Sequence, residues 1–63
     1  MHFDIERSVD GRFVWLLVGG NGETMVISEP LPSKQACRDA IATLKREAAA
    51  ARVHDHTGII RRP

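Results

Sequence analysis

The sequence predicts an α+β fold with three antiparallel strands, one helix and a fourth short strand, in that order. Two turn signals, Asp10-Gly11 and Gly19–Gly22, separate three runs that are rich in β-forming residues. A longer run with the apolar spacing of a helix follows Pro32. The 63 residues allow one domain only, which we place at residues 1–57, with a short tail at residues 58–63.

The first two strands are expected to form a hairpin. In His2–Glu6 apolar and polar residues alternate, which is typical of a short half-buried strand. Arg12–Val18 is rich in β-formers, and Asp10-Gly11 between the two runs predicts a type I′ turn, whose two central residues both need positive φ. The inner face of the hairpin follows from the alternation and comprises Phe3, Ile5, Phe13, Trp15 and Leu17.

The third strand is expected at Glu23–Ser28, after the second turn. Consecutive apolar residues blur its alternation, so its register stays open. Pro30 and Pro32 end the strand because proline cannot donate to a sheet. Ser33 can then cap a helix that starts at Lys34, since its hydroxyl can accept a bond from an unpaired backbone N–H.

The helix is expected over Lys34–Ala50. Its apolar side chains form one stripe that covers the sheet, made of Cys37, Ile41, Leu44 and Ala48 and flanked by Ala36 and Ala40. The alanines after Glu47 give no stop signal, so the C-terminal boundary stays open. Arg52–His56 then predicts the fourth strand, with Val53 as its main apolar residue and Thr57-Gly58 as its end.

The size of the chain predicts that it works with a second copy. A domain this short buries only about 60% of the surface of its unfolded chain, so a single core is marginal. Cys37 is the only cysteine, which excludes an internal disulfide and a cysteine-based zinc site and fits a reducing compartment. Oligomerisation is the supplement that remains, and a homodimer is its commonest form.

Taken together, these residues resemble the YegP-like family of small uncharacterised bacterial proteins. The resemblance runs from about residue 3 to residue 57 and rests on Phe3, Ile5, Phe13-Val14-Trp15, Leu17, Asn21-Gly22-Glu23, Ser28-Glu29, Ser33-Lys34, Ile41, Asp55 and Thr57. It implies a homodimer with one continuous sheet, in which the C-terminal strands are exchanged. It implies no catalytic residue and no cofactor. The expected dimer interface and core are then Phe3, Ile5, Phe13, Trp15, Leu17, Ile41, Leu44 and Val53.

Three residues of the second strand depart from the pattern of these relatives. Val14, Leu16 and Val18 are apolar, where the relatives tend to have basic or polar residues. They lie on the face opposite the core and leave an apolar stripe toward water. Two interpretations stay open: the stripe is a patch that binds an unidentified protein partner, or the C-terminal tail with Ile59 and Ile60 folds over it.

The charge of the chain argues against a dedicated nucleic-acid binder. Nine Lys and Arg against eight Asp and Glu give a net charge of +1, far from the strongly basic balance of that class. The outer face of the sheet offers neither cations nor exposed rings on which bases could stack. Weak nucleic-acid binding remains the alternative function, because one helix surface carries Lys34, Arg38, Lys45 and Arg46. A solvated helix face is the simpler interpretation.

No residue pattern predicts an enzyme, a metal site or a cofactor. Cys37 lies on the apolar helix stripe, where burial keeps a thiol protonated, and Gly19–Gly22 lacks the lysine of a phosphate-binding loop. His54 and His56 share one side of the expected fourth strand, but two ligands are too few for zinc. No membrane span or signal peptide is expected. We therefore expect a cytoplasmic, non-enzymatic structural or protein-interaction module.

Overall fold

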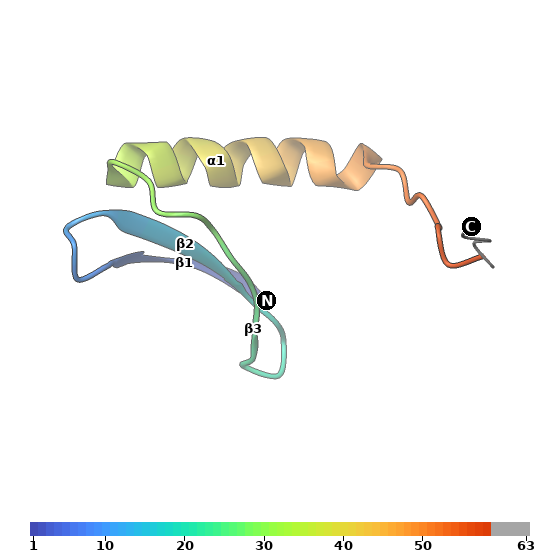
Figure 1. Cartoon of the computed structure of the whole chain (residues 1–63), viewed down its shortest axis with the longest axis horizontal. Helices are drawn as coiled ribbons and strands as arrows, with labels where there is room; N and C mark the ends of the chain where they lie inside the picture. The colour runs from blue at the N-terminus through green and yellow to red at the C-terminus, as the bar shows by residue number, and fades with distance from the viewer. Residues whose placement is uncertain (59–63) are drawn as a thin grey trace, which may run out of the picture.

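The computed structural model describes residues 1–58 and shows an α+β fold. Three antiparallel strands form a sheet in the order β1-β2-β3, and one helix lies across one face of it (Figure 1). The elements are β1 (His2–Arg7), β2 (Phe13–Val18), β3 (Thr24–Ile27), the helix α1 (Lys34–Glu47) and a 3-10 turn, Ala48–Ala50. The strand order and the start of the helix at Lys34 confirm the prediction.

The turn between β1 and β2 forms where it was expected but has another geometry. The Gly11 N–H donates to the Ser8 carbonyl (3.0 Å), and the Ser8 N–H donates to the Arg12 carbonyl (2.8 Å). Gly11 has a φ of +84°, whereas no other residue type has positive φ in the described chain. The predicted type I′ turn, which needs positive φ twice, is therefore wrong. A three-residue loop that ends in a left-handed glycine replaces it.

The turn between β2 and β3 repeats this arrangement. The Gly22 N–H donates to the Gly19 carbonyl (3.0 Å), the Gly19 N–H donates to the Glu23 carbonyl (2.8 Å), and Gly22 has a φ of +83°. In both turns the side chain of the residue before the left-handed glycine accepts a bond from the backbone two residues on: the Arg12 N–H donates to Asp10 Oδ1, and the Glu23 N–H donates to Asn21 Oδ1. The Asx-Gly pairs thus fix both hairpins.

The register of the first hairpin confirms which residues face inward. Phe3 pairs with Leu17 and Ile5 pairs with Trp15, so these four side chains share the face that α1 covers. The Phe3 and Trp15 rings meet edge to face, with centroids 5.9 Å apart. On the same face the Arg7 guanidinium lies 5.1 Å from the centre of the Phe13 ring, as part of a cation–π contact.

Val18 does not lie on an exposed outer stripe, which corrects the sequence prediction. The pairing of β2 with β3 shifts between Leu17 and Val18, so Val18 pairs with Thr24. Such a bulge bends the strand and changes the direction of its side chains. The Met25 sulfur also closes over this end, 3.1 Å from where a Cβ on Gly19 would stand. Val18 is only 7% exposed as a result.

The chain continues along the edge of β2 after β3 has ended. The Ser28 N–H donates to the Trp15 carbonyl, and the Trp15 N–H donates to Ser28 Oγ, both at 2.9 Å. Leu31 and Phe13 then exchange two backbone bonds of 2.7 and 2.9 Å. The backbone of β2 is thus paired despite the two prolines nearby. Ser33 Oγ accepts the Ala36 N–H at 3.0 Å and caps α1, as predicted.

The described residues after α1 and its 3-10 turn pair with no strand of the same copy. Residues 51–57 adopt no regular structure, and Val53 is 94% exposed. The predicted fourth strand at Arg52–His56 is therefore not formed within the chain. In Figure 1 the helix runs beyond the end of the sheet, and the following segment continues away from both. The tail residues Ile59 and Ile60, which were considered as a cover for the sheet, lie outside the described residues.

Candidate interaction surfaces

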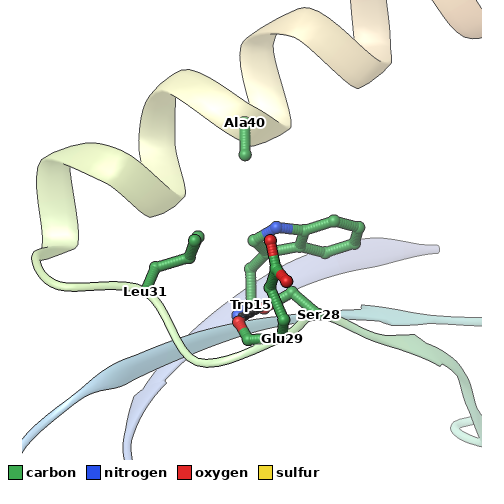
Figure 2. Close-up of a pocket in the computed structure, with 5 residues that line it drawn as sticks. All are labelled: Trp15, Ser28, Glu29, Leu31 and Ala40. Carbon is green, nitrogen blue, oxygen red and sulfur yellow. Dashed lines mark hydrogen bonds between the residues drawn. The ribbon is translucent and has the colours of Figure 1, made fainter.

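A groove runs between α1 and the edge of the sheet beside Trp15. It consists of two adjoining hollows of about 410 and 500 Å³, which share Trp15 and Ala40. Figure 2 shows the indole of Trp15 beneath the methyl group of Ala40, with the Glu29 side chain beside it. We call it the Trp15 groove; it is lined by Trp15, Ser28, Glu29, Leu31, Asp39, Ala40, Thr43, Leu44 and Glu47.

The hollow exists because a small residue faces a large one. Ala40 is the helix residue above the indole, and its methyl group is too short to fill the space that a Leu or Ile would fill. The walls are therefore mostly apolar and remain half-exposed at Trp15 and Leu44. The sequence contained the signal for this hollow, since Ala36 and Ala40 flank the apolar stripe. Only the structure shows that Ala40 lies over Trp15.

The groove has a negative rim. Glu29 comes from the segment after β3, while Asp39 and Glu47 lie eight residues apart on α1, in one row with Thr43. No lysine or arginine is among its lining residues. Within the described chain Asp39 accepts a bond from the Gln35 side chain at 2.9 Å, and Glu47 pairs with its neighbour Arg46 at 3.6 Å. The groove therefore favours an apolar group that carries positive charge.

The face of the sheet that α1 does not cover carries part of the predicted apolar stripe. Val14 and Leu16 lie there as predicted, opposite Glu6 and Asp4 of β1. Ile27 pairs with Leu16 and is 63% exposed, so it extends the patch where Val18 does not. We call Val14, Leu16 and Ile27 the outer patch. Sequence reasoning missed Ile27 because the alternation of β3 is blurred.

The predicted core residues come together, but few of them are fully buried. The side chains Phe3, Ile5, Phe13, Trp15, Leu17, Ile41 and Leu44 are all half-buried. Cys37 is the only residue of the described chain that solvent does not reach at all. Its thiol cannot meet a substrate unless the helix lifts from the sheet. Val53, the remaining predicted core residue, is the exception, because it touches neither the sheet nor the helix of its own chain.

The four basic residues of the helix divide into two groups. Lys34, Arg38, Lys45 and Arg46 are all exposed. At about 100° per residue, the first three lie within roughly 40° of one another on one flank of α1. Arg46 points elsewhere and contacts Glu47. This flank is separate from the row of Asp39 and Glu47, so α1 carries opposite charges on its two flanks.

The histidines after α1 lie next to each other. The rings of His54 and His56 are stacked, with centroids 6.2 Å apart and planes 14° apart. Asp55 between them uses its carboxylate locally, because it accepts the Thr57 N–H and hydroxyl. Among residues 1–58 no three His, Cys, Asp or Glu side chains gather as metal ligands. The described part of the chain also contains no helix long and apolar enough to cross a membrane.

These features define a class: a three-stranded antiparallel sheet with one covering helix and a C-terminal segment that extends away from it. The model of one protein family, a domain of unknown function (DUF1508), matches residues 8–55. The chain belongs to this family. The match confirms the resemblance to the YegP-like proteins that the sequence suggested.

Known relatives agree with this assignment along most of their length. Two UPF0339 proteins of Neisseria meningitidis, from serogroups B and A, are each 34% identical to this chain over 55 residues. The aligned part covers 87% of this chain and 98% of each relative. The solution structure of a protein from Haloferax volcanii has the same fold, with a TM-score of 0.75 and 31% identity. It covers 86% of this chain and 92% of that protein.

Proposed function

We propose that this chain is a non-enzymatic, cytoplasmic protein-interaction module that acts as a homodimer, in which two copies exchange their C-terminal segments. The carrying observation is the amount of surface that a single copy leaves exposed. Its accessible surface is 5497 Å², whereas a folded monomer of 7.0 kDa has about 4,000 Å². The excess of about 1,500 Å² supports the proposal, because it lies in the range that one chain contributes to an obligate dimer interface.

The shape of the single copy supports the same proposal. Its radius of gyration is 15.5 Å, against about 10.6 Å for a compact domain of this length. Within the part of the chain that the structure describes, β1 and β3 each leave one edge of the sheet without a neighbouring strand. Exposed edges invite pairing with another chain, and natural proteins cover them. A second copy supplies both the missing core and the missing strands.

Light scattering over a dilution series tests the homodimer. We expect a constant molar mass of about 14 kDa, twice the 7.0 kDa of one chain, down to low micromolar concentration. A chain that stays folded at the monomer mass over the whole series would refute the proposal, because the surface excess would then need no partner.

The outer patch is the proposed contact site of the dimer for another protein. Val14, Leu16 and Ile27 stay on the face that α1 does not cover. Leu16→Lys should therefore leave the molar mass and the fold unchanged while it abolishes retention of partner proteins in a pull-down. Val9→Lys is the matched control, since Val9 is exposed at the tip of the β1–β2 turn and is not part of this patch. Identical retention by wild type and Leu16→Lys would remove the reason for the patch.

Weak nucleic-acid binding is the second candidate function. The observation that favours it is the alignment of Lys34, Arg38 and Lys45 on one flank of α1, where none of the three forms an ion pair with a described residue. Three phosphate contacts predict a slope of about −2.7 for log K against log salt on duplex DNA. Absence of binding at low salt would dismiss this function, and a triple replacement of the flank by Gln should abolish any binding that is seen.

A further inference from the structure

Two exposed parts of the described chain have complementary chemistry. The Trp15 groove is apolar with three carboxylates on its rim, and Ala51–His54 is an exposed segment with an apolar residue beside a cation. We infer that the Trp15 groove receives the Ala51–His54 segment of a second copy, with Val53 against Trp15 and Leu44, and Arg52 facing Asp39 and Glu47. The inference rests on the proposed homodimer and adds the contact site.

The first argument is the fit between apolar surfaces. Val53 projects into water with 94% of its surface exposed, and the groove leaves the indole of Trp15 and the side chain of Leu44 half-covered. The hollow over Trp15 is large enough for a branched aliphatic side chain, because the small residue Ala40 is the only residue of α1 that lines it. Placing Val53 there removes two apolar surfaces from water in one contact.

The second argument is charge. Glu29, Asp39 and Glu47 border the groove, which has no lining lysine or arginine; the one described cation on this rim is Arg46, which contacts Glu47 from outside the lining. Ala51–His54 contains Arg52 and a histidine and no acidic residue. Complementary potentials of this kind fix the register of an interface and reject like-charged partners. The basic flank of α1 cannot serve the groove, because it lies on the other side of the same helix.

The third argument is direction, which favours a second copy over the chain's own segment. The backbone becomes extended at Ala51, with φ −67° and ψ 135°, directly after the 3-10 turn. From there it runs away from the sheet and past the end of α1 (Figure 1). The groove lies along residues 39–47 of α1, before this departure point, whereas the segment continues beyond it. Two copies related by a two-fold axis can each place the segment in the other's groove, which gives a closed dimer.

A charge exchange between two variants tests the inference. Arg52→Glu places a carboxylate opposite the acidic rim, and Asp39→Lys with Glu47→Lys places cations opposite Arg52. Each variant alone should weaken its homodimer about tenfold or more through repulsion of like charges. In an equimolar mixture both contacts of a mixed dimer are complementary, so mixed dimers should predominate in native mass spectrometry. Arg38→Glu, on the other flank of α1, is the control and should change nothing.

Trp15 provides an independent readout because it is the only tryptophan. We expect its emission to shift to shorter wavelength as the wild type and the mixed variants associate, since Val53 excludes water from the indole. The groove assignment would be overturned if both charge variants dimerised with the wild-type dissociation constant and the Trp15 emission did not change on association. The homodimer itself would remain supported by that outcome. A wild-type emission that is already shifted in a dilute monomer would show the chain's own segment in the groove and would overturn it as well. A wild type that never dimerises would refute the proposed function itself.

Discussion

The β1–β2 turn and the segment after α1 are built alike locally and differ in what they connect. In each, an aspartate accepts a backbone N–H two residues on: Asp10 from Arg12 at 3.0 Å and Asp55 from Thr57 at 2.9 Å. Each aspartate also accepts a neighbouring hydroxyl, from Ser8 or from Thr57. Each region presents a fully exposed valine, at position 9 or 53.

The difference lies in the surroundings of the two valines. Val9 stands at the tip of a loop that joins two paired strands, so its exposure follows from the turn geometry. Val53 belongs to an extended segment that joins no two elements of the described chain. If this segment stayed in water, a polar residue at position 53 would be equally suitable. Equal exposure in one copy thus has two explanations, and under the proposed homodimer the exposure of Val53 is explained by contact with the second chain.

The largest expected effect comes from charging the two valines. Val53→Asp should raise the dissociation constant of the dimer about 100-fold, or about 2.7 kcal/mol, because it buries an unpaired carboxylate against Trp15. Val9→Asp makes the same chemical change at equal exposure and should leave the constant unchanged. Sedimentation equilibrium of both variants measures the difference. If both variants dimerise like the wild type, the distinction between the two valines is wrong.

A second, smaller effect concerns the backbone of the turn. Gly11→Ala should lower the free energy of unfolding by about 1 kcal/mol, because a Cβ disfavours the left-handed conformation, although nothing lies within 4 Å of it. Gly20→Ala is the matched control: Gly20 also has open space but does not have positive φ. It should be neutral or stabilise by about 0.5 kcal/mol. Urea unfolding of the two variants gives the comparison, and equal losses would contradict the role assigned to φ.

The same turn shows how far the sequence alone could lead. Asp10-Gly11 correctly predicted a hairpin and the left-handed glycine. It could not predict the loop length, because a type I′ turn and a three-residue loop both use a left-handed glycine there. The choice depends on which residues of the two strands pair, and pairing is not a local property. The alternation of Phe13, Trp15 and Leu17 was sufficient for the inner face, since every one of them meets the side that α1 covers.

The candidate surfaces were less predictable because they depend on contacts between elements. The bulge that buries Val18 arises where β2 meets β3, whose register the sequence left open. The Trp15 groove depends on Ala40 standing above one particular ring (Figure 2). The fourth strand was predicted from the propensity of Arg52–His56, which is the same in a free segment and in one bound to another chain. Local sequence cannot distinguish these two environments.

The smallest effect separates the two aspartates by pH. The Ser8 hydroxyl, the Arg12 N–H and the Arg12 charge hold the pKa of Asp10 below its ordinary value of 3.8, and the hydroxyl and N–H of Thr57 lower the pKa of Asp55 in the same way. A lowered pKa in the folded state stabilises the fold above pH 3.8, and this stabilisation is lost as the pH falls below that value.

Replacing an aspartate by Asn keeps the acceptor oxygen but removes the ionisable group. The difference in unfolding free energy between wild type and Asp10→Asn should therefore be constant from pH 5 to 7 and shrink toward pH 2. Asp55→Asn should show no such change in dilute monomer, because the bonds of Asp55 to Thr57 are local to a segment that joins no two elements and can persist in the unfolded chain. A pH-independent difference for Asp10→Asn in urea titrations would show that the turn does not depend on the carboxylate charge.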